Sequence, residues 1–258
     1  MNIGIYGGTF NPIHLGHMTA ARYAAQVLAL DRLYFIPDGI PPHKTLGEGA
    51  PTPEDRLEMV RLAAGCLDLP RGEALASDLE QHRAGKSYTV DTLRELHQKF
   101  PKDTLWLLMG TDMFLTFHRW RDPERILGYC GLCAFGRSES DTEELFRSQR
   151  DYLERTYGAR VTTIVLPQLV DISSTQLRAL LSEEVPGSED CRGGKYLAPP
   201  VYGYILRHRL YGTAEDLRRL PLVKLRPAAL SHLKGSRIPH VLGTEDTAAA
   251  LARRWGAG

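Results

Sequence analysis

The chain has 258 residues, of which 43% are hydrophobic and 24% are charged, so it can bury a full core as one α/β domain with a small appendage. With a formal net charge of only +1, the protein has no overall positive electrostatic potential that would attract nucleic acid or a membrane surface. An anion must therefore be bound by a local cluster of positive groups. The N-terminus lacks the features of a signal peptide, and no apolar run reaches the roughly 18 residues of a membrane helix. We therefore expect a cytoplasmic protein.

Short apolar segments alternate with amphipathic segments along most of the chain. The predicted strands cover residues 3–6, 32–37, 104–110, 132–137 and 161–167. The predicted helices between them cover residues 15–30, 54–67 and 89–100. This order is typical of an α/β fold with a doubly wound parallel sheet, in which ligands bind outside the carboxyl ends of the strands. Motifs at strand-to-helix junctions are therefore the first candidates for a site.

The C-terminal part of the chain has a different pattern. Residues 182–200 are rich in turn formers and predict a loop, which a further helix follows. Just beyond that helix, Thr213 is placed to cap another one, and the remaining residues are mostly helical in pattern. We expect a main domain over residues 1–210 and a short helical C-terminal extension over residues 211–258.

The four cysteines give little reason to expect a metal or redox site. Cys130 and Cys133 form a CxxC within a predicted strand, but no second pair of cysteine or histidine residues completes a zinc site. We therefore expect free thiols in the core, and no metal held by protein ligands alone.

The first strand-to-helix junction has the sequence GIYGGTFNPIHLGH, residues 4–17. Gly7 and Gly8 leave room for a phosphate to approach the backbone amides. His14 and His17 lie three residues apart at the start of a helix, so both rings can project from one face toward the same ligand. A metal pair or two structural histidines are the alternatives, but the position at the carboxyl end of a parallel strand favours phosphate.

Seven motifs agree in order with one known family. They are GGTFNPIHLGH (7–17), PPHK (41–44), TPEDRLEMV (52–60), SYTVDTLREL (87–96), LMGTDMF (108–114), FHRW (117–120) and DISSTQLR (171–178). Over about residues 1–210 the chain resembles the nicotinate-nucleotide adenylyltransferases of the nucleotidylyltransferase superfamily. The resemblance implies a Rossmann-like fold and the transfer of an adenylyl group from ATP to nicotinate mononucleotide, giving nicotinate adenine dinucleotide and pyrophosphate in NAD biosynthesis. Asn11 stands where the family usually has Asp; both side chains form turns, so the geometry is expected to persist, but a carboxylate role is not carried over.

The same resemblance assigns roles to individual residues. The implied catalytic residues are His14, His17, Lys44 and Arg178. The implied ATP-binding residues are Gly7, Gly8, Thr9, Phe10, His17, Asp112, Ile172, Ser173, Ser174 and Arg178. The implied residues for nicotinate mononucleotide are Lys44, Tyr88, Thr89, Trp120 and Arg137, with Trp120 stacked on the pyridine ring.

Several of these residues also have a plain structural explanation, which the sequence leaves open. A helix cap is the alternative for Thr89, Asp112, Ser173 and Ser174. A position in the core is the alternative for Trp120, and a solvated surface position is the alternative for Lys44 and Arg137.

The implied reaction needs no general base, because a phosphate monoester with a second pKa of about 6 is already mostly dianionic at pH 7. Mg²⁺ is expected to be carried by the ATP phosphates, and the expected partners are ATP and nicotinate mononucleotide, without nucleic acid or membrane. The competing hypotheses are a phosphopantetheine adenylyltransferase, an aminoacyl-tRNA synthetase with the same histidine motif, and a nucleotide sensor without turnover.

The last residues also carry a partial resemblance. Residues 230–257 are similar to the opening helices of HD-type phosphohydrolases, with His240 in the place of the first metal-binding histidine. No His-Asp dipeptide follows it, so we expect an extension without hydrolase activity.

Overall fold

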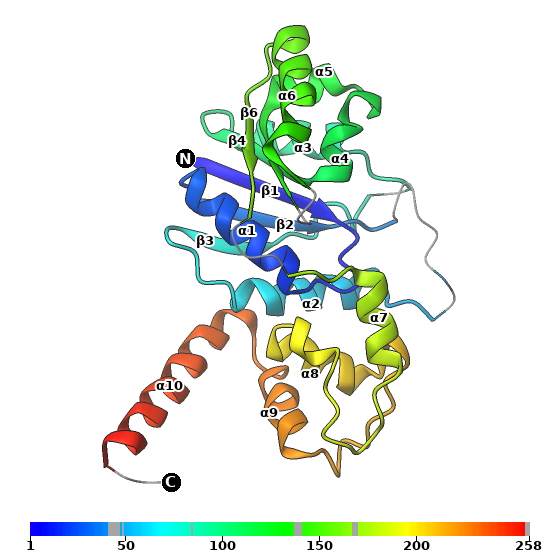
Figure 1. Ribbon diagram of the computed structural model, residues 1–258, viewed down its shortest axis with the longest axis vertical. Helices are drawn as coiled ribbons and strands as arrows, with labels where there is room; N and C mark the ends of the chain where they lie inside the picture. The colour runs from blue at the N-terminus through cyan, green and yellow to red at the C-terminus, as the bar shows by residue number, and fades with distance from the viewer. Residues whose placement is uncertain (41–46, 48, 84, 137–140, 167–169, 256–258) are drawn as a thin grey trace.

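The computed structural model describes residues 1–40, 47, 49–83, 85–136, 141–166 and 170–255. Its centre is an all-parallel sheet of six strands in the order β3-β2-β1-β4-β5-β6 (Figure 1). The strands are β1 (Asn2–Gly8), β2 (Arg32–Pro37), β3 (Glu73–Ala76), β4 (Thr104–Gly110), β5 (Cys130–Phe135) and β6 (Val161–Ile164). This order confirms the predicted doubly wound sheet.

The described helices occupy both sides of the sheet and continue beyond it. They are α1 (Leu15–Val27), α2 (Pro53–Gly65), α3 (Thr89–Lys99), α4 (Thr111–Leu115), α5 (Pro123–Tyr129), α6 (Glu143–Tyr157), α7 (Ser174–Ser182), α8 (Pro199–His208), α9 (Leu222–Leu230) and α10 (Ile238–Trp255). Short 3-10 turns lie at η1 (Phe117–Arg119), η2 (Gly194–Tyr196), η3 (Leu210–Gly212) and η4 (Gly235–Arg237). None of the helices in the described part of the chain is long and apolar enough to cross a bilayer.

The sheet divides the core into two clusters, because successive residues of a strand point to opposite faces. One cluster packs α1, α2, α7 and α8 against one face, and the other packs α3, α4, α5 and α6 against the opposite face. Cys133 belongs to the first cluster and Cys130 to the second, and both are buried free thiols. Two residues three positions apart in a strand point to opposite faces, so the sheet lies between the two sulfurs. This agrees with the expectation of free thiols in the core.

Two details of the predicted elements need correction. The strand β3 was not predicted, because its four residues, Glu-Ala-Leu-Ala, are too short and too exposed to show an apolar alternation. The helix predicted to start at Thr213 is wrong, since residues 213–220 contain no helix. The Thr213 hydroxyl instead donates to the carbonyl of Leu210 at 2.9 Å and to that of Ile205 at 3.3 Å, so it closes the preceding helix.

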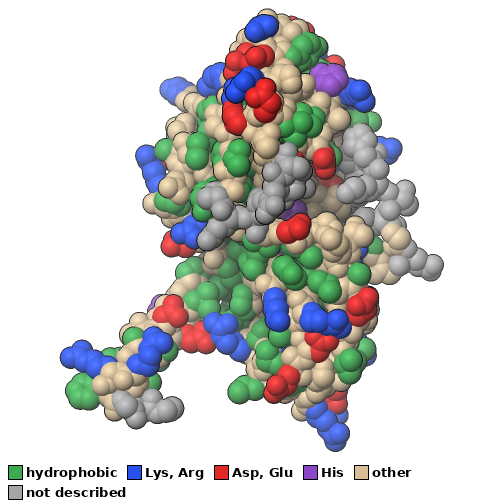
Figure 2. Space-filling model, viewed as in Figure 1, with side chains coloured by type: hydrophobic (Ala, Val, Ile, Leu, Met, Phe, Trp, Pro, Cys, Tyr) green, Lys and Arg blue, Asp and Glu red, His purple; other side chains and the backbone are tan. Residues whose placement is uncertain are grey.

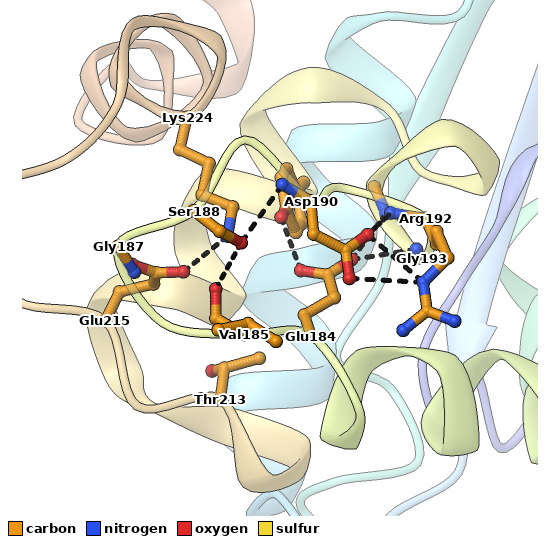
Figure 3. Close-up of polar contacts among 12 residues, drawn as sticks. Glu184, Val185, Gly187, Ser188, Asp190, Arg192, Gly193, Thr213, Glu215 and Lys224 are labelled. Atoms are coloured by element: carbon orange, nitrogen blue, oxygen red, sulfur yellow. Dashed lines mark hydrogen bonds and ion pairs between the residues drawn. The ribbon is translucent and has the colours of Figure 1, made fainter.

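The segment after residue 211 packs closely on α8. A Cβ at Gly203 of α8 would overlap the carbonyl of Pro227 in α9, so glycine is required for this approach. Lys224 and Glu215, both buried, form an ion pair at 2.5 Å, and Glu215 also accepts from the amide of Gly187 (Figure 3). The division at residue 210 stays a prediction, and α9 lies directly against α8.

The helix α10 extends away from the rest of the molecule (Figure 1). Leu251 and Trp255 are exposed on it, as is His240. In the described part of the chain, no three histidine, cysteine, aspartate or glutamate side chains converge to hold a metal ion. Acidic and basic side chains are interspersed over the face of the molecule shown in Figure 2, as the net charge of +1 leads one to expect.

Candidate active site

A cavity of about 1450 Å³ opens at the carboxyl end of the sheet. It is lined by the ends of β1 and β4 and by the first residues of α1, α3 and α7. Helix N-termini present unpaired backbone amides and a partial positive charge, so three of them facing one cavity favour anionic ligands.

The glycine turn after β1 is open toward this cavity. A Cβ built on Gly7 would meet no atom within 4 Å, whereas one on Gly8 would contact the Phe10 ring at 3.4 Å. Phe10 is 3% exposed and packs edge-on against Tyr6, so its ring belongs to the core although the residue also lines the cavity. Gly7 is thus the position where the backbone is free for close approach by a ligand.

The two histidines lie together at the start of α1. Their ring centroids are 3.7 Å apart, and the backbone amide of His14 donates to Nδ1 of His17 at 3.3 Å. Because Nδ1 of His17 accepts a hydrogen bond, a neutral His17 carries its proton on Nε2, where it can donate to a ligand. A Cβ at Gly16 would lie 3.0 Å from the His14 ring and 3.3 Å from the carbonyl of Val170, so the glycine between the histidines keeps this packing possible.

The turn that precedes the histidines is held by side chains from remote elements. Arg56 of α2 is fully buried and donates to the carbonyl of Thr9 at 2.9 Å and to the Asp38 carboxylate at 2.8 Å. On the other side, Arg178 of α7 donates to the carbonyl of Asn11 at 2.9 Å. These contacts fix the path of the chain between β1 and α1.

Tyr211 of η3 also reaches this turn, where its hydroxyl donates to Oδ1 of Asn11 at 2.7 Å. Burial raises the pKa of Tyr211 far above its usual range, so the hydroxyl stays a donor. The amide side chain of Asn11 thus keeps a local hydrogen-bonding role, as expected for a residue that shapes the turn.

The start of α7 combines capping with a place in the cavity. Ser173 is the N-cap, and its hydroxyl accepts from the amide of Gln176 at 3.2 Å. Ser174 donates to the carbonyl of Pro12 at 3.3 Å. Both serines line the cavity, as do Ile172 and Arg178. Ser173 is therefore a helix cap, as the structural alternative predicted, and it also lines the cavity.

The other predicted residues described by the structure line the same cavity, among them Asp112, Tyr88, Thr89 and Trp120. The capping alternatives for two of them are wrong. Thr89 is the first residue of α3 and follows the N-cap Tyr88, and the N-cap of α4 is Gly110 rather than Asp112. Lys44 and Arg137 lie outside the described residues.

The sequence patterns did not identify some residues that line the cavity or hold its walls. Arg56, which holds the turn after β1 without lining the cavity, occupies a position on the apolar face of α2, four residues before the buried Val60, and a charge at such a position is a signal that could have been recognised. Glu80 lines the cavity; it accepts from the Thr92 hydroxyl at 2.6 Å, and burial raises its pKa. Tyr211 and Ser87 gave no such signal, because their places depend on tertiary contacts.

Comparisons with known proteins agree with this geometry. The cytidylyltransferase-like family matches residues 5–180. The probable nicotinate-nucleotide adenylyltransferase of Carboxydothermus hydrogenoformans is 36% identical over 210 residues, which are 81% of this chain and 97% of that relative. The relative of the same description in Thermus thermophilus is 39% identical over 212 residues, which are 82% of this chain and 100% of that relative.

The fold is also similar to a solved structure. Plasmodium falciparum nicotinic acid mononucleotide adenylyltransferase complexed with NaAD superimposes with a TM-score of 0.65 at 21% identity, over 83% of this chain and 98% of that one. At this identity the similarity supports the fold alone. The family match over residues 5–180 and the relatives of 36% and 39% identity establish that this chain belongs to the cytidylyltransferase-like family, among its nicotinate-nucleotide adenylyltransferases.

Proposed function

We propose that this chain joins nicotinate mononucleotide to ATP, forming nicotinate adenine dinucleotide and pyrophosphate. The observation that carries the proposal is one cavity that combines the adjacent rings of His14 and His17 with the N-termini of three helices. The relatives that this chain matches over nearly their whole length are described as probable nicotinate-nucleotide adenylyltransferases. Cations and amides suit two polyanionic substrates.

The reaction requires alignment more than proton transfer. An oxygen of the mononucleotide phosphate attacks the α-phosphorus of ATP, a new P–O bond forms, and the bond from the α-phosphorus to the bridging oxygen breaks as pyrophosphate leaves with the electron pair. The nucleophile is a dianion at neutral pH, since its second pKa is about 6. The protein must therefore hold two mutually repelling anions in line.

Charge that builds on the α-phosphoryl group and on pyrophosphate must then be stabilised. His17 and the first residues of α1 and α7 line the cavity, so Nε2–H of His17 and the N-terminal amides of these helices would supply donors for this charge. Arg178 adds a cation beside them, and the resemblance adds Lys44. Mg²⁺ would enter on the ATP phosphates and neutralise part of their charge.

His17→Ala tests this assignment. If His17 donates mainly to charge that develops in the transition state, the substitution lowers kcat by about 100- to 1000-fold and raises the KM for ATP only modestly. Pyrophosphate release with ATP, Mg²⁺ and nicotinate mononucleotide measures both constants. His240→Ala, at an exposed position on α10, is the matched control and should leave turnover unchanged. A His17→Ala enzyme with nearly normal kcat contradicts the role.

The same assay compares acceptors. We expect pyrophosphate release to be fastest with nicotinate mononucleotide, slower with nicotinamide mononucleotide and absent with phosphopantetheine. Fastest release with phosphopantetheine would favour the related adenylyltransferase, and binding of ATP without release for any acceptor would favour a sensor.

A further inference from the structure

The side chain of Arg56 connects two turns at the carboxyl end of the sheet. The turn after β1 starts at Thr9, and the turn after β2 starts at Asp38. Nη1 of Arg56 donates to the carbonyl of Thr9 at 2.9 Å, and Nη2 donates to the carbonyl of Gly39 at 2.8 Å. Because β1 and β2 are neighbouring parallel strands, the two turns leave the sheet side by side. One buried guanidinium thus holds both turns.

Backbone contacts fix the second turn on its other sides. The amide of Asp38 donates to the carbonyl of Gly8 at 3.1 Å, so the turn after β2 is tied directly to the glycine turn of the cavity. A Cβ at Gly39 would lie 2.8 Å from the carbonyl of Glu80, so this glycine lets the turn pack against the segment that follows β3. A shift of Arg56 would therefore be transmitted to the glycine turn, which faces the ligand.

Asp38 places a negative charge in a cavity that we assign to anions. The residue is 7% exposed and lines the cavity. Its Oδ1 accepts from Nη1 of Arg56 at 2.8 Å, and its Oδ2 accepts from the Thr9 hydroxyl at 3.0 Å. An unbalanced carboxylate here would repel the phosphates of ATP, and the repulsion would be strong because salt and water screen a buried charge poorly. The ion pair with Arg56, whose guanidinium is always protonated, balances this charge.

Arg56 itself does not line the cavity, so it can act on a substrate only through Thr9, Asp38 and the turns that carry them. We infer that Arg56 is a positioning residue of the reaction: it holds the turns after β1 and β2 in place and balances the charge of Asp38 beside the ATP phosphates. The kinetic part of this inference rests on the proposed function. The two effects are separable, because the position of the turns determines how well the reacting groups are aligned, whereas the charge balance determines how tightly ATP binds.

Two substitutions of Arg56 separate position from charge in the full chain. Arg56→Lys keeps the positive charge but lacks the planar fork that reaches both carbonyls, so kcat should fall about 10-fold while the Kd for ATP stays within about 2-fold of the wild type. Arg56→Gln also leaves Asp38 without its cation, so the Kd for ATP should in addition rise about 10-fold. Pyrophosphate release measures kcat, and titration calorimetry with ATP and Mg²⁺, without an acceptor, measures Kd.

Asp38→Asn provides a charge rescue. Combined with Arg56→Gln it removes both charges, so the Kd for ATP should return to within about 3-fold of the wild type while kcat stays low. A role of Arg56 in stability alone predicts no such recovery, since the double variant lacks the same contacts as Arg56→Gln. Asp38→Asn alone keeps an acceptor for Arg56 and makes the wall of the cavity more positive, so it should lower the Kd about 2-fold. Together with Arg56→Lys, it decides the question if Arg56→Gln does not fold.

Arg61→Gln is the matched control, because Arg61 is an exposed arginine on the same helix, α2, and does not line the cavity. It should leave kcat and Kd as they are in the wild type. The inference is overturned if Arg56→Lys keeps the wild-type kcat, if Asp38→Asn raises the Kd, or if the Kd stays high in the double variant. A wild type that binds ATP but releases no pyrophosphate with any mononucleotide contradicts the proposed function instead, and the Kd values still test the charge balance at Asp38.

Discussion

At the scale of single residues, the site depends on contacts between positions far apart in the sequence. Tyr211 and Asn11 are 200 residues apart, yet the tyrosine hydroxyl donates a hydrogen bond to Oδ1 of the asparagine at 2.7 Å. Both Tyr211 (φ 57°) and the nearby Arg209 (φ 52°) have left-handed backbone conformations, which are unfavourable for residues other than glycine. The fold maintains this conformation, and it places the Tyr211 ring at the wall of the cavity.

We therefore predict that Tyr211 positions the turn before the histidines. Tyr211→Phe removes only the hydroxyl and leaves Oδ1 of Asn11 without this donor, so the turn that leads to His14 and His17 is held less firmly. We expect kcat to fall about 5- to 10-fold, with a loss of about 1 kcal/mol in the free energy of unfolding. Pyrophosphate release and urea unfolding measure the two effects.

Tyr152→Phe, at an exposed position on α6, should change neither quantity. A Tyr211→Phe enzyme with wild-type kcat and reduced stability would show that the hydroxyl supports the fold alone, and would contradict the positioning role.

The sequence predicted one part of this arrangement and not the other. The glycines and histidines of the first junction are local, so their spacing along a strand and a helix already brings them together. Arg56 and Tyr211 act on the same turn from remote positions, and no spacing rule connects them with it. Single-sequence patterns identify the donors that face the ligand more readily than the residues that hold those donors in place.

At the scale of elements, α9 is fixed to α8 by a close helix contact and by a buried ion pair. Lys224 and Glu215 are 0% and 2% exposed, and Figure 3 shows Glu215 between Lys224 and the amide of Gly187. Glu184 has a similar role nearby, where it accepts from the amide of Gly193 at 2.8 Å and from the Tyr202 hydroxyl at 2.6 Å. Two buried carboxylates thus tie the loop before α8 to the helices around it.

We predict that Lys224→Met is strongly destabilising, by about 3–5 kcal/mol, because it leaves Glu215 buried without its cation. The double variant Lys224→Met with Glu215→Gln should recover part of the loss, since the glutamine is neutral and its oxygen can still accept from the amide of Gly187. Urea unfolding of the single and double variants measures the coupling. Removing the exposed pair between Arg226 and Glu245 is the comparison and should cost much less. Equal losses in the single and double variants would contradict this explanation.

The errors in element prediction have a common physical cause. Thr213 has the residue type of an N-cap, but a threonine hydroxyl can also donate to the carbonyls of a preceding helix, and tertiary packing selected the second role. The short strand β3 forms because β2 offers a pairing edge rather than because its own sequence favours a strand. Long periodic segments such as α1 and α3 have enough apolar positions for the sequence pattern alone to predict a helix.

At the scale of the whole molecule, the parallel sheet explains both the core and the site. Strands buried on both faces separate two apolar clusters, and helices that return to parallel strands place their N-termini at the carboxyl edge. That is why the location of the cavity was predictable from the order of elements. Its shape depends on side chains of α7 and η3, which line it, and on Arg56 of α2, which holds the turn after β1. The order of elements does not determine these contacts.

The two cysteines of β5 offer a test of whether the two clusters unfold together. Cys133 packs in the cluster of α1, and Cys130 packs in that of α3. Burial raises the pKa of each thiol to about 12, so at pH 8 only about one molecule in 10⁴ carries the thiolate at either position. Both thiols should therefore resist alkylation in the folded protein.

Because β1, β2, β4, β5 and β6 each contribute side chains to both clusters, separating one cluster from the sheet would expose the other. We predict that Cys130 and Cys133 become reactive at the same urea concentration, which also matches the loss of helical circular dichroism. Mass spectrometry of alkylated peptides distinguishes them, and the half-buried Cys66 and Cys191 serve as internal references that react earlier. Reaction of one β5 thiol at a clearly lower urea concentration than the other would mean that one face of the sheet opens by itself, and that the molecule does not unfold as a single unit.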